Sequence, residues 1–260
     1  MRNLVVWALA PLFCLTMVAE ENAPIDANQT KRADFRYSIG IAVANVPYFD
    51  ASVKSHLRVL PYGDLRYKAL FLSPFKGLGV DLPLGGGAVF SPSISWRGER
   101  KESYDKTLKG LGDIDAEATY GASISFMRPN FTAGANFFRG FSSGASTYAI
   151  NAGFPFRLGE SWTIAPGVSA QFGDRKYNRI YYGINQTQAA ASRYDRYKPS
   201  DGLVNISASL MAYYGITQRV GAAVFVSRKY FVDQAAASPF IKAEDDEQNN
   251  FGAMILYRGP

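Results

Sequence analysis

The sequence of 260 residues contains one cysteine, Cys14, and one histidine, His56. A structural zinc site needs several Cys or His ligands, and Ser-His-Asp chemistry needs a histidine beside its nucleophile. His56 falls in a predicted loop near Lys54, so we expect neither kind of site, no bound metal and no other cofactor. Cys14 lies in an apolar N-terminal run typical of a signal peptide. A mature chain without it has no disulfide and needs a large core or a membrane to hold its fold.

Charged residues are also scarce, at 19% of the chain, and the positive ones are scattered. The net charge is +6, yet no basic run is longer than Lys31-Arg32 or Arg228-Lys229. Proteins that bind nucleic acids concentrate Lys and Arg on one surface or helix. We therefore expect no nucleic acid among the partners.

Long apolar runs are missing except at the N-terminus, where residues 4–18 form a run of 15. A basic residue before this run and a polar segment after it are typical of a secretory signal peptide. We predict a signal peptide over residues 1–19, with cleavage between residues 19 and 23, and a separate N-terminal segment over residues 20–34. No later segment has 18 consecutive apolar residues, so no transmembrane helix is expected.

Aromatic residues, at 14%, and 24 glycines are abundant instead, a composition that favours strands over helices. From Trp162 to Phe172, apolar residues fall on one face and small or polar residues on the other. The same alternation recurs in the segments 35–43, 113–126, 148–156, 204–214 and 251–257. Pieces of this length are typical of tilted strands that cross a bilayer.

The polar faces of these predicted strands carry Ser, Thr, Asn and Gly rather than Lys and Glu. A soluble sandwich would place charged residues on its outer faces. The pattern therefore predicts an inside-out barrel, with apolar faces toward lipid and polar faces toward a lumen. Short connections such as 127–130, 158–161 and 214–218 alternate with long ones at 174–202 and 230–247, as periplasmic turns alternate with outer loops.

The predicted fold class is all-β, a transmembrane antiparallel up-and-down β-barrel over residues 35–260 that follows a periplasmic segment. Such barrels have an even number of strands. Residues 57–97 could supply two strands or four. The sequence therefore favours 12 strands, with 10 as the alternative.

The stretch KGLGDIDAEA, residues 109–118, places three acids at alternate positions. In a strand over 113–126 all three would point into the lumen, roughly 7 Å from neighbour to neighbour. Catalytic carboxylates need a substrate cleft, and an EF-hand loop needs glycine at its sixth position, so we predict no catalytic residue and no metal site here. Because like charges repel strongly in a narrow barrel, we predict an ion-pair network instead. The predicted lumen-facing charged network consists of Asp113, Asp115, Glu117, Arg66, Lys68 and Arg36.

Six segments spread over most of the chain are similar to those of one protein family, in the same order. They are VPYFDAS (46–52), VLPYGDLRYKALFLS (59–73) with GLGVDL (77–82), LKGLGDIDAEATYG (108–121), YYGINQTQAAASRYDRYKPSDGL (181–203), YYGITQRVG (213–221) and AAASPF (235–240). Together they resemble the MipA/OmpV family of Gram-negative outer-membrane proteins. The resemblance implies a barrel in the outer membrane, surrounded by outer-membrane lipid and lipopolysaccharide.

The resemblance also implies a function. It suggests a non-enzymatic scaffold that bridges a lytic murein transglycosylase to a bifunctional murein synthase at the periplasmic side. The residues leave two alternatives open. One is a narrow pore or small-solute transporter whose lumenal charges set selectivity. The other is a surface adhesin or receptor that uses the outer loops 174–202 and 230–247.

Overall fold

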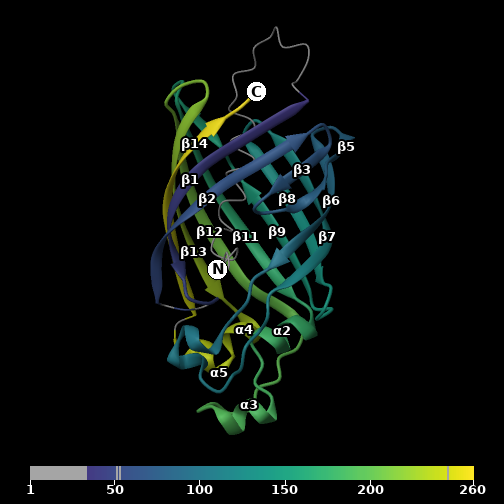
Figure 1. The fold of residues 1–260 in the computed structure, drawn as a ribbon, viewed down its shortest axis with the longest axis vertical. Helices are drawn as coiled ribbons and strands as arrows, with labels where there is room; N and C mark the ends of the chain where they lie inside the picture. Colours follow the sequence, from purple (N-terminus) through teal and green to yellow (C-terminus); the bar gives the residue numbers. More distant parts are fainter. Residues whose placement is uncertain (1–33, 51, 53, 245) are drawn as a thin grey trace.

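The computed structural model describes residues 34–50, 52, 54–244 and 246–260. Its strands form a closed antiparallel barrel, seen from the side in Figure 1. The strand order is β10-β11-β12-β13-β14-β1-β2-β3-β4-β6-β7-β8-β9, and the pairing of β9 with β11 closes the circle. Short β5 pairs with β6 beside β4, and short β10 pairs with β11 beside β9, so each continues an interrupted strand. The described wall thus has 12 strands, which confirms the predicted number.

Most strands are long enough to cross a bilayer at the usual tilt. Their bounds are β1 (Phe35–Pro47), β2 (Ser55–Tyr67), β3 (Leu70–Ser73), β4 (Gly77–Val80), β5 (Leu82–Gly85), β6 (Ala88–Arg97), β7 (Glu117–Arg128), β8 (Phe131–Gly140), β9 (Ser146–Gly153), β10 (Phe156–Leu158), β11 (Trp162–Gly173), β12 (Gly202–Gly215), β13 (Val220–Phe231) and β14 (Glu247–Arg258).

The region 57–97, which could have supplied two strands or four, supplies four strands of the wall, β2, β3, β4 and β6. The alternative of ten strands is therefore wrong. β3 and β4 have only four residues each. The turn between β5 and β6 needs its run of glycines, because Gly85, Gly86 and Gly87 all have positive φ, at 85°, 61° and 83°. L-residues with a side chain rarely adopt that conformation.

The predicted alternation on β11 is confirmed. Trp162 and Val168 are exposed on the outer face, whereas Thr163 and Ala165 are buried on the inner face. Aromatic pairs lie toward both ends of the outer wall, as in the girdles of membrane barrels. Trp162 and Tyr214, with ring centroids 4.9 Å apart, belong to one end, and Tyr120 and Phe141, 4.8 Å apart, belong to the other.

The two ends of the barrel differ, as Figure 1 shows. Short turns at residues 129–130, 159–161 and 216–219 lie at the end where β1 begins and β14 ends. Helices and long loops gather at the opposite end, at the bottom of the figure. They include η2 (Glu102–Tyr104), η3 (Lys106–Leu108), α2 (Arg175–Tyr181), α3 (Gln186–Ala191), α4 (Asp233–Ala236) and α5 (Pro239–Lys242). We call the first end the inner end and the second the outer end, since barrels of this kind keep short turns and both termini in the periplasm.

The predicted signal peptide, residues 1–19, lies outside the described residues, as does all but Asp34 of the predicted segment 20–34. Within the part of the chain that the structure describes, no helix is long and apolar enough to span a membrane.

Candidate functional site in the lumen and the outer cap

One side of the lumen is filled by apolar side chains. Inward residues of β1, β2 and β11 to β14 form a buried cluster. Its members are Ala42, Ala44, Val46, Leu60, Tyr62, Ala165, Met211, Tyr213, Ala223, Phe225, Met254 and Leu256, with Phe75 packed against them. The prediction of a lumen lined by small polar residues is therefore wrong on this side. Large apolar side chains can face inward here because they pack against one another instead of meeting water.

Arg66 lies in an ion cluster that connects β2 with the segments that follow the short strands β3 and β4. Its Nη1 is 2.6 Å from Oδ2 of Asp81, and its Nε is 3.2 Å from Oδ1 of Asp64. The hydroxyl of Ser91 on β6 donates a 2.6 Å hydrogen bond to Oδ1 of Asp81. Because β3 and β4 are short, this cluster supplies a direct polar link from β2 to β6.

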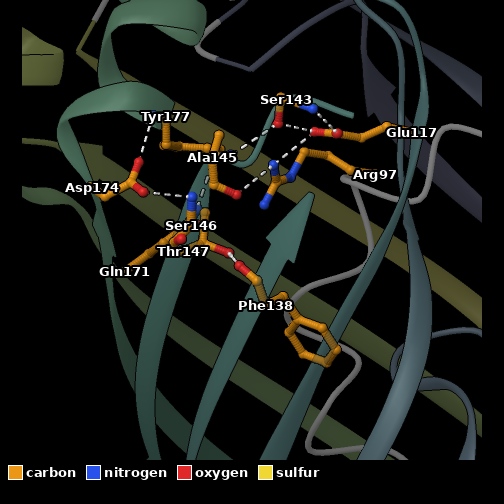
Figure 2. A network of polar contacts seen from close by, with 10 residues as sticks. All are labelled: Arg97, Glu117, Phe138, Ser143, Ala145, Ser146, Thr147, Gln171, Asp174 and Tyr177. Atoms are coloured by element: carbon orange, nitrogen blue, oxygen red, sulfur yellow. Dashed lines mark hydrogen bonds and ion pairs between the residues drawn. The ribbon is translucent and has the colours of Figure 1, made fainter. Parts of the chain in front are cut away.

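Glu117 is held in a second cluster at the outer end of the lumen, shown in Figure 2. Oε1 of Glu117 is 3.0 Å from Nη1 of Arg97, and the two side chains are 8% and 3% exposed. The backbone N–H and the hydroxyl of Ser143 also donate to this carboxylate, at 2.9 and 2.7 Å. Arg97 donates further to the carbonyl of Ala145. A buried carboxylate with three donors is well satisfied, so this cluster locks β6, β7 and the β8–β9 connection together.

The structure corrects the prediction for Asp113 and Asp115, which do not face the lumen. β7 begins at Glu117, and both aspartates lie in the outer loop before it. Asp115, whose side chain is 90% exposed, is 2.8 Å from Nζ of Lys101. Asp113 accepts from the backbone N–H of Glu102 and lies 3.5 Å from the same lysine. That backbone hydrogen bond is the main reason why the pKa of Asp113 is lowered.

Lys68 and Arg36 also lie apart from Asp113, Asp115 and Glu117, the acids of the predicted network. Lys68 is in the turn between β2 and β3, with a φ of 53°, and its exposed Nζ is 3.9 Å from Asp34. Its predicted lumenal position is therefore wrong. Arg36 is half-buried on β1, directly across from Arg66 in the pairing of β1 with β2. The predicted single network is thus two separate clusters, one around Arg66 and one around Glu117.

The outer end of the barrel is covered by an ordered cap with its own apolar core. This core consists of Phe49, Leu108, Leu111, Ala145, Tyr177, Tyr181, Tyr182, Ile184, Tyr194, Val204, Phe231, Ala235, Phe240 and Ile241. Two of its helices, α2 and α3, begin at side-chain caps. Asp174 accepts from the N–H of Tyr177, and Asn185 and Gln188 form a capping box at the start of α3. The amide of Gln188 also donates to the carbonyl of Leu111, which joins two loops that are far apart in sequence.

Buried ionic groups link the cap to the barrel. Arg100 donates from Nη1 to the carbonyl of Tyr181 at 2.8 Å and lies over the ring of Phe240. Burial lowers the pKa of Arg100 to about 10. Nζ of Lys229 on β13 lies 2.8 Å from Oδ1 of Asp50, whose other carboxylate oxygen accepts from the hydroxyl of Tyr182. The cap is therefore fastened to the barrel wall at several points.

A further ion pair joins the β1–β2 loop to the loop that carries η3. Nζ of Lys54 is 2.7 Å from Oδ2 of Asp105. Burial opposes ionisation of Asp105, but hydrogen bonds from Lys54 and from the backbone and hydroxyl of Thr107 outweigh it and lower its pKa to about 2. Asp105 is therefore ionised at any pH at which the cell grows.

The spaces near the cap are small, and one of about 150 Å³ lies beside Ser95, Arg97 and Thr119. A cavity of about 40 Å³ lies between Tyr48, Asp50, Arg100, Tyr181 and Tyr182. Sites for small-molecule ligands have volumes of roughly 300 Å³ or more. The described residues contain no group of three or more His, Cys, Asp or Glu placed to hold a metal ion. The arrangement of the lumen and cap is that of a closed, cross-braced barrel.

Sequence reasoning missed several of the residues that hold this arrangement, among them Arg97, Arg100, Asp50 and Lys229. A signal existed for Arg97. The alternation of residues 88–97 places it on the same face as Ser91, Ser93 and Ser95, which would have identified it as the inward partner of an acid. No comparable signal exists for Asp50 or Arg100, because they lie in loops whose path depends on the cap.

Comparisons with known proteins find one family and several distantly similar structures. A family model described as MltA-interacting protein MipA matches residues 39–259. A comparison with curated proteins finds no match. Among solved structures, an outer membrane channel from Pseudomonas putida F1 is 11% identical, with a TM-score of 0.44 over 91% of this chain and 99% of that chain. OmpT, an outer membrane protein of Vibrio cholerae, is 9% identical, with a TM-score of 0.40 over 88% and 99%. The KdgM porin is 8% identical, with a TM-score of 0.38 over 86% and 96%.

Proposed function

Since the chain belongs to the MltA-interacting protein MipA family, we propose that it is a non-enzymatic adaptor that holds murein-hydrolysing and murein-synthesising proteins at the outer membrane. It is an outer-membrane β-barrel protein of Gram-negative type. The family description supports a partner of the murein transglycosylase class. The choice between adaptor, pore and receptor then depends on how the barrel itself is built.

The packing inside the barrel is the observation that carries this proposal. The apolar cluster on one side, the Arg66 and Glu117 clusters, and the packed outer cap all lie along the path that a solute would follow, and a space of about 150 Å³ remains beside Ser95, Arg97 and Thr119. Moving these groups would break buried ion pairs and expose apolar surface, both of which cost several kcal/mol. Such packing would hinder conduction through a pore, whereas it would make an anchor more rigid.

The inner end offers a charged surface for such partners. Four exposed positive side chains project near the periplasmic turns, namely Lys68, Arg128, Arg157 and Arg219, against the exposed acids Asp34 and Glu160. We call the four positive residues the inner basic rim. A rim of this charge fits an acidic surface on the partner and would speed encounter at low salt. The turns themselves are short, and a stable interface buries roughly 800 Å² per partner. The partner would therefore cover much of the barrel's inner end.

A direct binding measurement tests the adaptor role. The barrel in lipid nanodiscs is immobilised, and a purified lytic murein transglycosylase or bifunctional murein synthase is passed over it. We expect binding of both enzymes by the wild type, and affinity lowered by about tenfold in Arg128→Gln/Arg219→Gln. The matched control, Lys106→Gln/Lys109→Gln, removes the same charge from exposed positions of the outer cap and should bind as the wild type does. Absence of binding of either enzyme to the wild type would refute the adaptor role.

A receptor role at the cell surface is the second candidate, and the ordered cap favours it. Preformed surfaces bind with less loss of conformational entropy than flexible loops do. The exposed α3 and its flanking residues project farthest from the barrel in Figure 1. Removal of residues 185–192 should abolish binding to host cells or phage if the cap is the recognition surface. Unchanged binding would exclude α3 from that role.

A further inference from the structure

Two positive side chains near the outer edge of the wall approach the same point. Arg139 lies on the outer face near the end of β8, and Lys176 lies in the first turn of α2, and both are exposed. A Cβ atom built on Gly144, in the connection between β8 and β9, would sit 3.2 Å from Nζ of Lys176 and 3.5 Å from Nη2 of Arg139. The two cationic nitrogens are therefore at most about 7 Å apart, a distance at which like charges repel.

Two acids of this region, Asp174 and Glu117, have other partners, which Figure 2 shows. Both oxygens of Asp174 accept backbone N–H groups, one from Ser146 and one from Tyr177. Glu117 is occupied by Arg97 and Ser143. Within the described chain, no ion pair joins Arg139 or Lys176 to a carboxylate. The pair therefore presents uncompensated positive charge at the surface.

Arg139 lies at the height on the barrel wall where the headgroups of the outer leaflet are expected. β8 runs outward from Phe131, which lies 5.5 Å from Phe154 in the inner aromatic band, to Arg139. Eight residues along a strand cover about 27 Å, or roughly 20 Å along the barrel axis at the usual tilt, close to the height of the apolar band of such barrels. Arg139 pairs with Tyr120 across the β7–β8 ladder, and Tyr120 packs against exposed Phe141. Aromatic side chains in this arrangement mark the headgroup level of the bilayer.

An apolar groove lies below the two cations on the lipid-facing wall. It spans β9, β11 and β12, with a volume of about 450 Å³. Its outward lining consists of Ile150, Ala152, Val168, Ala170, Ile206 and Ala208, with Tyr230 of β13 at one side. Because alanine side chains are small, the surface is recessed at the three alanines, between the larger side chains. Ser146, the partner of Arg139 in the β8–β9 ladder, is four residues from Ile150, so the groove begins about 13 Å along the strand, or roughly 10 Å along the barrel axis, below Arg139.

We propose that Arg139 and Lys176 bind the phosphate group of a phosphorylated lipid of the outer leaflet, with an acyl chain of the same lipid in the groove over β9, β11 and β12. A phosphate supplies the negative charge that the pair lacks, and the guanidinium of Arg139 can hold it with two parallel hydrogen bonds. The spacing between cations and groove is that between a headgroup and the upper part of its chains. This site is independent of the adaptor role, since it lies on the outer wall and not at the inner basic rim.

Retention of lipid by the detergent-solubilised barrel, measured by native mass spectrometry, tests the proposal. The probes are bis-phosphorylated lipid A, the same lipid after dephosphorylation, and inorganic phosphate. We expect Arg139→Gln/Lys176→Gln to retain lipid A with at least about tenfold lower affinity than the wild type, and Lys106→Gln/Lys109→Gln to match the wild type. Dephosphorylated lipid A should bind the wild type as weakly as lipid A binds the double variant.

A groove variant separates a lipid site from a simple anion site. Ala170→Trp fills the groove without touching the cations, so it should weaken binding of lipid A but leave any binding of inorganic phosphate unchanged. Equal retention of lipid A by wild type and Arg139→Gln/Lys176→Gln would overturn the proposal. So would equal affinity for phosphorylated and dephosphorylated lipid, or unchanged lipid A binding by Ala170→Trp. Heat-modifiable migration on unboiled gels confirms that each variant is folded before it is scored.

Discussion

The inward faces of β1, β2 and β12 to β14 share an apolar cluster that includes Leu60, Met211 and Phe225, whereas on β6 to β9 the inward side chains are mostly small, hydroxyl-bearing or charged. The outer faces of the same strands do not differ in this way, since both halves present exposed Ile and aromatic residues. Lipid imposes one requirement on every outward position. Inside the barrel, each inward side chain needs only to be packed against others or paired with a polar partner. One half uses apolar packing, and the other uses hydrogen bonds and ion pairs.

The difference has an energetic consequence. In the polar half, stability depends on a few buried charges that are satisfied only as pairs. In the apolar half, it depends on the volume of many side chains. Removing one partner of a buried pair leaves an unpaired charge, while removing a buried apolar group leaves a cavity. Mutations on the two sides should therefore differ in size and in how they can be rescued.

The largest effect is expected for Glu117→Ala in the polar half. It leaves the buried guanidinium of Arg97 without its carboxylate and should lower the free energy of unfolding by about 3–5 kcal/mol, measured by urea denaturation in detergent micelles. Arg97→Met/Glu117→Met replaces the pair by apolar groups of similar size and should recover most of the loss. A single variant as stable as the wild type would show that the pair does not brace the barrel.

A somewhat smaller effect is expected for Leu256→Ala in the apolar half. Leu256 is 2% exposed inside the lumen, so the cavity left behind should cost about 2–4 kcal/mol in the same urea measurement. Its neighbour Ile255 is 52% exposed on the outer wall and provides the matched control. Ile255→Ala should cost clearly less. Equal losses for the two variants would contradict a packed lumen.

The ion pair of Lys54 with Asp105 in the cap should contribute less, and its contribution should depend on pH. The folded pKa of Asp105, about 2, lies below its ordinary value of 3.8, so the stabilisation is present above pH 4 and is lost as the pH falls toward 2. Because Lys54 is half exposed, we expect about 1 kcal/mol at most between wild type and Asp105→Asn near neutral pH. Thermal unfolding followed by tyrosine fluorescence should show this difference shrinking in acid. A difference that grows in acid would contradict the assignment.

The smallest effect is expected for Asp115→Ala. Its side chain is 90% exposed in the outer loop, so the change in the free energy of unfolding should stay within about 0.5 kcal/mol. Together with Glu117→Ala, this variant tests where β7 begins. A decrease of several kcal/mol in the free energy of unfolding of Asp115→Ala would instead indicate that Asp115 faces the lumen.

Much of the wall could be predicted from the sequence, because lipid enforces a strict period of two on every strand. The start of β7 could not be predicted. Ile114 and Ala116 continue the alternation into a loop whose backbone is also extended, with Ile114 bridged to Arg100. Lys101 and Glu102, which lie 11 to 14 residues earlier in the same connection, hold Asp113 and Asp115 outside the barrel.

The lumen was also predicted only in part. A Ser-rich inward face is visible on residues 88–97, but the same period on β12 gives no sign that Met211 and Tyr213 pack against other strands rather than line a wet channel. Which inward groups meet depends on how the sheet closes, and the order of strands in the sequence does not specify contacts across the lumen.

The proposed adaptor role requires that the packed lumen keeps the barrel from conducting. Planar-bilayer recording of the purified wild-type protein in dilute potassium chloride tests it most directly. The account predicts no steady conductance in wild type or in Asp115→Ala, and brief openings at most in Glu117→Ala, where the brace at the outer end of the lumen is broken. A steady, ohmic conductance in the wild type would contradict it and would favour a pore.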